Sequence, residues 1–404
     1  MNIIKAALRW FVWTVISKIF ILCHIKGNYH FSRKKPCDPI PKPPFLVIAN
    51  HGTFFDPWMA GFYSFTPFLF MINDDAFRAS KFTSLYLKIV GTIPKKKGAS
   101  DFKAMKTTLS CLKSGKAVCI FPEGQTTWDG ETQPIYSGIE KIAKRAKCPI
   151  MFVRFQGNFL SKPWWAKTQR KGKVAISFKT LSREEIEQLS EPQLLEKIKS
   201  SIYQNDIKDP SNLKIPFKGK NMAEGLENFL WVCRECNKED SLKAKNNTIE
   251  CTNCNQKYDI DAHCRFYTRS SPAPEFDLHD WAGYQKQDVK NRIKNASAND
   301  NILTFSTNVE IQRAENNRQT YSTLAQDGTL TLTREIMSFK SDELELRWPV
   351  SSTANFVVQR KNIFQFDNGD NEIRVVLKDK SPMKWVTYLR YLNGFEEYEN
   401  RGHL

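Results

Sequence analysis

The sequence predicts an α/β domain with a mixed sheet and helices on both faces, followed by a small cysteine-rich module and a mostly-β C-terminal domain. Three observations predict this order. Apolar runs alternate with helical patterns up to about residue 212, two Cys-x2-Cys pairs lie between residues 233 and 254, and short alternating runs follow residue 300. We therefore place the domains at residues 1–28, 29–212, 213–266 and 280–404.

Residues 3–25 are mostly apolar but are interrupted by Arg9 and Lys18. No stretch reaches the ~18 uncharged residues typical of a spanning helix. On an ideal helix, the nine-residue spacing puts the two charges on nearly opposite faces, which spoils an amphipathic stripe. We predict a helix that lies in the membrane interface; a spanning helix and a buried helix of a soluble domain remain alternatives. A cleaved signal peptide is not expected, because Lys18 interrupts the apolar run and no small-x-small site follows.

The α/β elements follow from apolar runs and helical spacing. For example, Phe102, Met105, Leu109 and Leu112 recur at helical spacing. The predicted strands are 45–50, 68–72, 117–121, 148–155 and 173–178. The predicted helices are 58–68, 76–90, 101–114, 139–146 and a pair within 181–206, the second of which starts at Ser190.

The heptapeptide NHGTFFD, residues 50–56, follows the first of these strands. It places His51 and Asp56 five positions apart. An imidazole that abstracts a proton needs its second nitrogen held by an acceptor, and a carboxylate does this best. Taken alone, the spacing also fits an ordinary loop histidine.

A second motif, AVCIFPEG at residues 117–124, is a strand that breaks at Pro122. GTIPKKKG (residues 91–98) lies between the two motifs and CPIMFV (residues 148–153) follows them. This order of four blocks resembles the glycerolipid and lysophospholipid acyltransferase family, whose best-known member is 1-acylglycerol-3-phosphate acyltransferase. The resemblance covers roughly residues 25–210 and is carried mainly by the pairing of NHxxxxD with FPEG.

The resemblance implies a role for each matched residue. His51 is the expected general base that deprotonates a lysolipid hydroxyl, and Asp56 orients it. The acyl donor is an acyl-CoA or an acyl-carrier protein, and no covalent acyl-enzyme is expected. Glu123 and Gly124 are expected to bind the polar head of the acceptor.

Two departures from the family pattern concern the acceptor. Thr126 stands where the family has an arginine, and Lys97 replaces a second one. Lysine binds a phosphate as a point charge, without the planar fork of arginine. The missing arginines weaken the case for lysophosphatidate as the acceptor. A different lysolipid, such as lysophosphatidylcholine or a lyso-ornithine lipid, is the alternative.

The charge is concentrated in the first half of the chain. Net charge is +17, yet residues 1–220 hold 36 Lys and Arg against 16 Asp and Glu. A basic, aromatic-rich half favours an anionic membrane surface and an anionic donor. We expect attachment to the inner membrane of a bacterium, with the catalytic domain on the cytoplasmic face. No nucleic-acid motif accompanies the charge, so nucleic acid is not an expected partner.

Four cysteines form two knuckles 14 residues apart: Cys233, Cys236, Cys251 and Cys254. This spacing is a zinc-ribbon signature, and four thiolates close a tetrahedral shell, so the expected role is structural. Two disulfides or no metal are the alternatives. The basic segment 157–173, with the pair Trp164 and Trp165, suits a membrane interface. The same segment resembles one found in a bacterial subgroup of the acyltransferase family that also carries a metal-binding extension.

The C-terminal part predicts short antiparallel strands. A helix is expected at 281–294, a polar linker at 295–300 and type I′ hairpin turns at Asp327-Gly328 and Asn368-Gly369. Ser381-Pro382 opens a last helix. Strands closed by such a helix resemble a pleckstrin-homology or GRAM-type domain in pattern, and no ligand is assigned to it.

Three functions follow, of which the first is favoured: a membrane-associated lysolipid acyltransferase, an inert lipid-binding scaffold of the same fold, and a zinc-ribbon nucleic-acid binder. The histidine, the aspartate and the glutamate of the two motifs are all present, which argues against the scaffold. The stretch between the knuckles is mixed in charge and has no aromatic residue, which argues against the third.

Overall fold

The computed structural model describes residues 3–28, 30–35, 37–73, 76–77, 81–95, 102–135, 138–268, 270–271, 273–296, 301–315, 320–369, 371–378 and 380–394. The chain divides into two compact units. The first contains the chain up to Trp164 and Gln169–Gly219. The second contains Trp165–Thr168 and the chain from Lys220 on.

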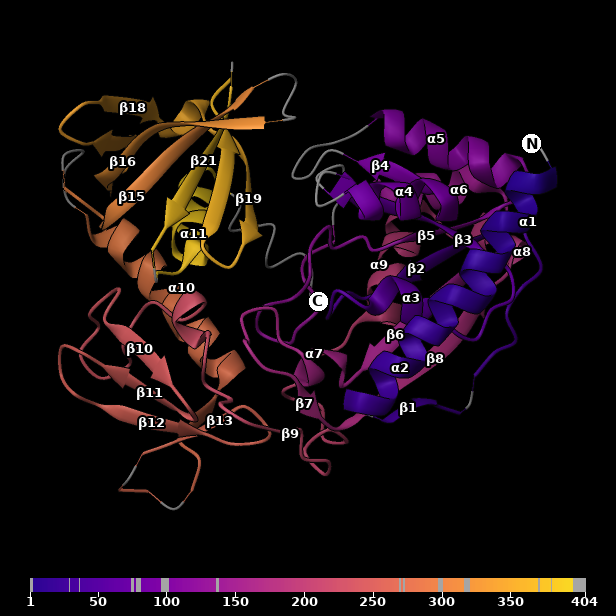
Figure 1. Cartoon of the computed structure of the whole chain (residues 1–404), viewed down its shortest axis with the longest axis horizontal. Helices are drawn as coiled ribbons and strands as arrows, with labels where there is room; N and C mark the ends of the chain where they lie inside the picture. Colours follow the sequence, from indigo (N-terminus) through magenta and orange to yellow (C-terminus); the bar gives the residue numbers. More distant parts are fainter. Residues whose placement is uncertain are drawn as a thin grey trace. The chain divides into compact units, whose positions relative to one another are not determined.

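A seven-stranded mixed sheet forms the middle of the first unit, as predicted (Figure 1). Its strands are, in order across the sheet, β1 (His30–Arg33), β8 (Lys173–Leu181), β6 (Ile150–Gln156), β2 (Phe45–Ala49), β5 (Ala117–Ile120), β3 (Phe68–Asn73) and β4 (Thr92–Lys95). Neighbouring strands are parallel except β6 and β8, which are antiparallel. The carboxyl ends of β2 and β5, where the two motifs lie, therefore meet at one edge of the sheet.

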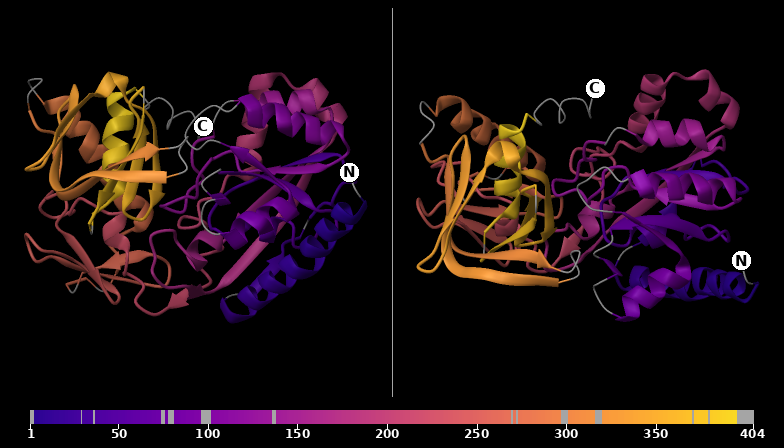
Figure 2. Two further views of the ribbon diagram at one scale, coloured as in Figure 1. Left: turned by 45° about the horizontal axis from the view of Figure 1, so that its top comes forward. Right: turned by 90° about the horizontal axis from the view of Figure 1, so that it is seen from above.

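Both faces of the sheet are covered by helices. Leu46 and Ile48 of β2 point into one core, together with residues of α5 (Phe102–Lys113), α6 (Ile139–Ala146), α8 (Arg183–Gln188) and α9 (Glu191–Ile202). On the other face, the ring of Trp13 packs on Phe68 and Phe70 of β3. Figure 2 shows the indigo N-terminal helix on one side of the sheet and magenta helices on the other.

Further elements of the first unit connect these strands and helices. They are α3 (Asp56–Ala60), α4 (Lys81–Val90), α7 (Asn158–Ser161), β7 (Arg170–Lys171) and β9 (Lys218–Gly219). The prediction of a helix over 58–68 is wrong beyond Ala60. The chain turns at Ser64, whose hydroxyl bonds the amide and carbonyl of Thr66, and Pro67 cannot continue a helix.

The N-terminal helix consists of α1 (Ile3–Phe11), a π-helical segment (Val12–Ser17) and α2 (Lys18–Asn28). The prediction that Arg9 and Lys18 lie on opposite faces is wrong. A π-helix turns less per residue than an α-helix, so it brings the two charges towards one side. Arg9 donates to the carbonyl of Pro67 and the Lys18 ammonium lies 4.1 Å from the centre of the Phe65 ring.

Residues Ile3–Ile25 are long and apolar enough to cross a membrane, judged by length and composition alone. Within the first unit, however, one side of this helix is packed. Trp13, Ile21 and Ile25 are buried, and Gly61 leaves no room for a side chain, because a Cβ there would lie 2.0 Å from the Trp13 ring. This packing favours the predicted helix that lies along a surface.

The second unit begins with a five-stranded antiparallel sheet that carries the cysteines. Its strands are β10 (Leu242–Lys245), β11 (Thr248–Cys251), β12 (Lys257–Ile260), β13 (Arg265–Tyr267) and β14 (Phe276–Asp277). The helix α10 (Leu278–Asn295) follows, capped by Asp277, and agrees with the predicted helix over 281–294. Two 3-10 turns, Leu226–Asn228 and Val350–Ser352, complete the helical elements described in this unit.

Seven antiparallel strands and a last helix follow, as the sequence predicts. The strands are β15 (Thr304–Glu315), β16 (Thr320–Leu332), β17 (Ile336–Lys340), β18 (Glu345–Pro349), β19 (Ala354–Arg360), β20 (Ile363–Asp367) and β21 (Glu372–Leu377), and the helix is α11 (Pro382–Leu392). Trp385 and Tyr388 of α11 are fully buried. β15 joins the two halves of the sheet by pairing with β16 and with β21.

The predicted hairpin turn at Asp327-Gly328 is wrong. Both residues lie inside β16, where Asp327 has φ 54° and the register with β15 shifts, so they form a bulge. A Cβ on Gly328 would lie 2.2 Å from the Phe339 ring, which explains the glycine. β20 and β21 form the predicted hairpin, but the Asn368 amide donates to the Asn371 carbonyl, so Asn368 flanks the turn and does not lie at its centre as predicted.

Trp165 does not lie at a surface. The segment Trp165–Thr168 belongs to the second unit, and the Trp165 side chain is fully buried there. The Lys361 ammonium donates to the Ala166 carbonyl and the Thr168 hydroxyl to the Lys220 carbonyl. The prediction that this tryptophan anchors a membrane interface is therefore wrong.

Candidate active site

The end of β2 and the start of α3 bring the two residues of the first motif together. His51 follows the buried strand, and Asp56 opens α3 after a tight turn in which its amide donates to the Thr53 carbonyl. The Nδ1 atom of His51 lies 2.9 Å from Oδ2 of Asp56. The imidazole is 19% exposed and packs against the Phe121 ring, whereas the carboxylate is fully buried. The geometry is that of a base held by a carboxylate.

Asp56 is surrounded by hydrogen-bond donors. Besides His51, its Oδ2 accepts from the amides of Gly52 (2.7 Å) and Thr53 (2.9 Å). Its Oδ1 accepts from the Thr53 hydroxyl (2.6 Å) and from Nδ2 of Asn158 (3.0 Å). Five donors use the lone pairs that a carboxylate offers, so its orientation is fixed and its negative charge is compensated without a cation.

The carboxylate of Glu123 binds two backbone amides of the site. Its Oε1 accepts from the His51 amide and its Oε2 from the Gln133 amide, both at 2.6 Å, and the side chain is almost fully buried. Burial holds the pKa of Glu123 well above its ordinary value, against the lowering effect of the two amides. In this geometry Glu123 positions His51, and its two oxygens are engaged by the protein itself.

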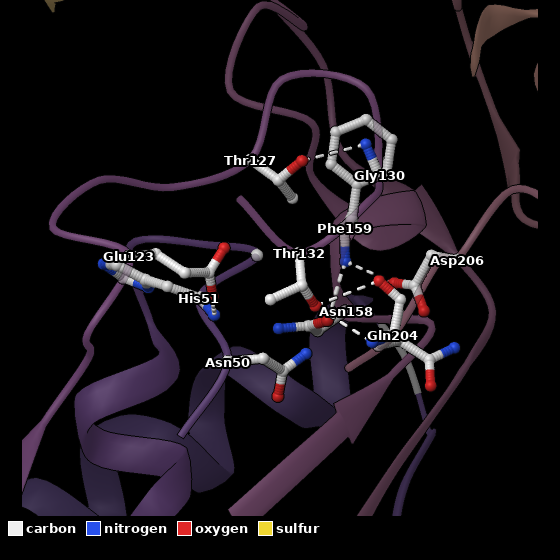
Figure 3. A pocket seen from close by; sticks show the side chains of 11 residues that line it. Asn50, His51, Glu123, Thr127, Gly130, Thr132, Asn158, Phe159, Gln204 and Asp206 are labelled. Atoms are coloured by element: carbon white, nitrogen blue, oxygen red, sulfur yellow. Dashed lines mark hydrogen bonds between the residues drawn. The ribbon is translucent and has the colours of Figure 1, made fainter. Parts of the chain in front are cut away.

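A small polar pocket opens beside the imidazole; the empty space there, open solvent included, is about 180 Å³. Figure 3 shows His51 and Glu123 on one side and the side chains of Asn158, Gln204 and Asp206 on the other. The lining residues are Asn50, His51, Gly52, Glu123, Thr127, Gly130, Thr132, Asn158, Phe159, Gln204 and Asp206. Among the described residues, the lining contains carboxylates, amides and hydroxyls but no lysine or arginine.

The other predicted substrate residues lie apart from this pocket or outside the described residues. Gly124 follows Glu123 with φ 72° and is exposed, and Thr126 is half-buried; neither lines the pocket. Lys97 lies outside the described residues.

Sequence reasoning missed Asn158, Gln204 and Asp206. They come from α7 and from the chain after α9, about a hundred residues or more beyond His51. Asp206 is buried, and burial raises its pKa to about 7, opposed by hydrogen bonds from Gly157, Phe159, Asn212 and Gln204. The only sequence signal was a polar cluster after a predicted helix, which is common in ordinary loops.

A second candidate site lies in the second unit. The four sulfur atoms of Cys233, Cys236, Cys251 and Cys254 lie within 4.8 Å of one another, and the closest pairs, at 3.7 Å, are too far apart for disulfides. The two knuckles share one geometry. Asn237 and Asn255 have positive φ, and each donates its amide to the carbonyl of the first cysteine of its knuckle (3.0 and 2.9 Å). Four thiols placed in this way can hold a metal ion, as the sequence predicts.

Comparisons with known proteins bear on the first unit. Residues 28–156 match the family model described as Acyltransferase. No curated protein matches the sequence. The chain is similar to the crystal structure of the 1-acyl-sn-glycerophosphate (LPA) acyltransferase, PlsC, from Thermotoga maritima, with 17% identity and a TM-score of 0.38 over 50% of this chain and 92% of that chain. So distant a likeness carries no argument beside the family match. Residues 28–156, the part of the chain that matches the acyltransferase family model, contain the His51–Asp56 pair and Glu123.

Proposed function

We propose that this protein is a membrane-associated acyltransferase that transfers a fatty acyl group from an acyl thioester to a hydroxyl of a lysophospholipid or related lysolipid. The observation that carries this proposal is the His51–Asp56 pair, 2.9 Å apart at the end of β2, inside a segment that matches the acyltransferase family. The donor is an acyl-CoA or an acyl-carrier protein, as the family resemblance implies.

The proposed mechanism uses the two nitrogens of His51. Nδ1 carries the proton that it donates to Asp56, so Nε2 accepts the proton of the acceptor hydroxyl. The hydroxyl oxygen attacks the thioester carbonyl, the bond to sulfur breaks, and the thiolate leaves with the proton that His51 returns. Asp56 stabilises the imidazolium that exists between the two proton transfers. No bond forms between the acyl group and the protein.

Glu123 has a positioning role in this proposal, because its two oxygens accept the amides of His51 and Gln133. Lys97, Gly124 and Thr126 remain proposed contacts of the acceptor head. No lysine or arginine of the described part of the chain lines the polar pocket beside His51, and Thr126 stands where the family has an arginine. These two features keep acceptors other than lysophosphatidate, including lyso-ornithine lipids, within the proposal.

The membrane attachment in this proposal rests on an exposed apolar surface of the first unit. We call it the N-terminal apolar surface; its members are Ile3, Ile4, Leu8, Trp10, Phe11, Ile16, Ile19, Phe20 and Leu22 of the N-terminal helix, with Phe54, Phe65, Phe82 and Leu85. α4, which carries Phe82 and Leu85, packs against α1. Phe20 contacts Phe55 and Trp58, next to the His51–Asp56 turn. A patch this large marks an interaction site, and a lipid layer would place the lysolipid beside His51.

Replacing Phe82 and Leu85 together with serine is expected to weaken binding to anionic vesicles at least tenfold. The two side chains are 80% and 57% exposed, so the change removes apolar area without opening a core. Burial of each such side chain in lipid is worth roughly 1.5–3 kcal/mol. Vesicle co-sedimentation measures the effect, with Leu213→Ser, at another exposed leucine of the first unit, as the matched control. Equal binding by the double variant and the wild type would remove these residues from the membrane surface.

The second unit has structural roles in this proposal. Zn²⁺ is the metal that four thiolates in a closed tetrahedral shell favour. The seven strands and α11 form a domain of pleckstrin-homology or GRAM type, without an assigned ligand. Free thiols at all the described cysteines fit a catalytic domain on the cytoplasmic face of the inner membrane.

The function is tested by offering radiolabelled acyl-CoA, and in parallel acyl-carrier protein, with a panel of lysolipids to detergent-solubilised protein. The panel contains lysophosphatidate, lysophosphatidylcholine and lyso-ornithine lipid. Label in one diacylated lipid identifies the acceptor and supports the proposal. Vesicle binding without transfer to any acceptor from either donor favours an inert lipid-binding scaffold instead.

A further inference from the structure

We propose that Asn158 and Asp206 are positioning residues of the catalytic pair. Asn158 holds the Asp56 carboxylate in the orientation that fixes His51, and Asp206 holds Asn158. This inference rests on the proposed acyl transfer. Both residues lie beyond residues 28–156, so they are not part of the segment that matches the acyltransferase family.

The orientation of the Asn158 amide is determined by its two partners. Its Oδ1 accepts the amide of Phe159 at 3.0 Å, and its Nδ2 donates to Oδ1 of Asp56 at 3.0 Å. The reversed amide would set an oxygen against the carboxylate and an NH₂ against an N–H donor, which makes two repulsive contacts. Asn158 is 1% exposed, so both bonds are shielded from bulk water.

Gly52 of the first motif makes room for this contact. A Cβ at Gly52 would lie 2.7 Å from Nδ2 of Asn158, closer than real side chains approach. The Gly52 amide meanwhile donates to Oδ2 of Asp56. The glycine of NHGTFFD therefore leaves the space through which the Asn158 amide reaches the Asp56 carboxylate. A side chain at this position of the motif would block that contact.

Asp206 fixes the segment that carries Asn158. Its Oδ1 accepts the amide of Gly157 at 2.7 Å and its Oδ2 accepts that of Phe159 at 3.0 Å. The carboxylate therefore binds the residues on both sides of Asn158 in the chain. The Asp206 amide donates to the carbonyl of Gly130. Figure 3 shows Asp206 and Asn158 on the same wall of the pocket, with the bond from Phe159 to Asp206 dashed.

The consequence for catalysis concerns the tautomer of His51. The imidazole acts as a base through Nε2 only while its proton is on Nδ1, where Asp56 accepts it. Without the donor from Asn158, Oδ1 of Asp56 keeps only the Thr53 hydroxyl, so the carboxylate is held less firmly in the orientation that binds Nδ1. A hydrogen bond to a charged group is worth about a 10- to 100-fold change in equilibrium. We expect a fall of that size in kcat, with the KM values of donor and acceptor little changed.

The test compares Asn158→Ala and Asn158→Asp with the wild type. Asn158→Asp keeps the shape of the side chain but sets a second carboxylate against Asp56, so its kcat is expected to fall at least as far as that of Asn158→Ala. Asn205→Ala is the matched control, because Asn205 is a nearly buried asparagine whose side-chain oxygen accepts the amides of Ile207 and Lys208, away from Asp56. It is expected to lower the unfolding temperature and leave kcat per folded protein unchanged.

A second readout does not depend on activity. The protein has six histidines, and ¹⁵N-histidine NMR, with His51→Ala for assignment, reports which nitrogen of His51 carries the proton. We expect Nδ1–H in the wild type and a mixture of tautomers in Asn158→Ala. Wild-type kcat together with an unchanged tautomer in a folded Asn158 variant would overturn the inference, as would Nε2–H in the wild type.

The inference can still be tested if the Asn158 variants do not fold or if the wild type is inactive. If neither Asn158 variant folds, Asp206→Asn is used, because an amide offers one acceptor in place of two and frees either Gly157 or Phe159. Its folded form is expected to show the same loss of kcat and mixed tautomer, and wild-type behaviour contradicts the inference. If the wild type transfers no acyl group at all, the proposed function fails, while the tautomer comparison still decides the roles of Asn158 and Asp206.

Discussion

Replacing His51 with alanine is expected to lower kcat for acyl transfer by about 10²- to 10⁴-fold, the usual worth of a positioned general base. The imidazole lines the polar pocket, and its Nδ1 atom is held by the buried Asp56 carboxylate. In the proposed mechanism His51 transfers a proton and does not hold either substrate, so the KM values should change little. Steady-state transfer of labelled acyl groups measures the effect.

The control for this prediction is His30→Ala. His30 lies on the edge strand β1, is exposed, and pairs with its neighbours through its backbone. It is expected to have wild-type kcat, and both variants are expected to keep the wild-type unfolding temperature and vesicle binding. A His51→Ala enzyme that retains most of its activity would show that another group accepts the proton.

Removing the metal is expected to destabilise the whole second unit, including the seven-stranded sheet. The loop after the first knuckle carries Glu239 and Asp240, which are bound by the C-terminal elements. The ammonium of Lys384, fully buried on α11, lies 2.5 Å from Asp240, and the Tyr388 hydroxyl donates to Glu239 at 2.7 Å. Release of the knuckle leaves the Lys384 charge buried without its partner, which costs roughly 3–5 kcal/mol.

Hydrogen exchange before and after chelation measures this coupling. Amides of β15 and α11 are expected to lose protection together with those of the ribbon, and Lys384→Met is expected to make the sheet less sensitive to chelation. Lys378→Met is the matched control, since the ion pair of Lys378 with Asp327 is exposed and contributes little to stability. Loss of protection confined to residues 225–265 would contradict the coupling and leave the ribbon as an independent module.

The parts of the structure that could be predicted from the sequence depend on local signals. His51 and Asp56 lie five residues apart, so one turn brings them together. The strands that bear the motifs are short, uniformly apolar and fully buried. The four cysteines meet because each knuckle is itself a local turn.

The parts that could not be predicted depend on contacts between distant segments or on local irregularities. Asn158 is 102 residues from Asp56 in the chain, and no short motif marks it. Asp327-Gly328 has the composition of a hairpin turn, but the pairing of β15 with two strands makes it a bulge. The π-helical segment that brings Arg9 and Lys18 to one side has no sequence signature of its own. Trp165 is buried in a unit whose other main segment begins at Lys220, more than fifty residues later.

The central claim is that a lipid hydroxyl, deprotonated by His51, attacks the acyl thioester directly. A single-turnover experiment tests it most directly. Excess wild-type protein is mixed rapidly with labelled acyl-CoA, with and without the acceptor found in the panel, and free thiol and labelled lipid are followed together. We predict that thiol appears only with acceptor, at the same rate as the lipid product, and that His51→Ala slows both. Rapid thiol release without acceptor, with label retained on the protein, would contradict the account.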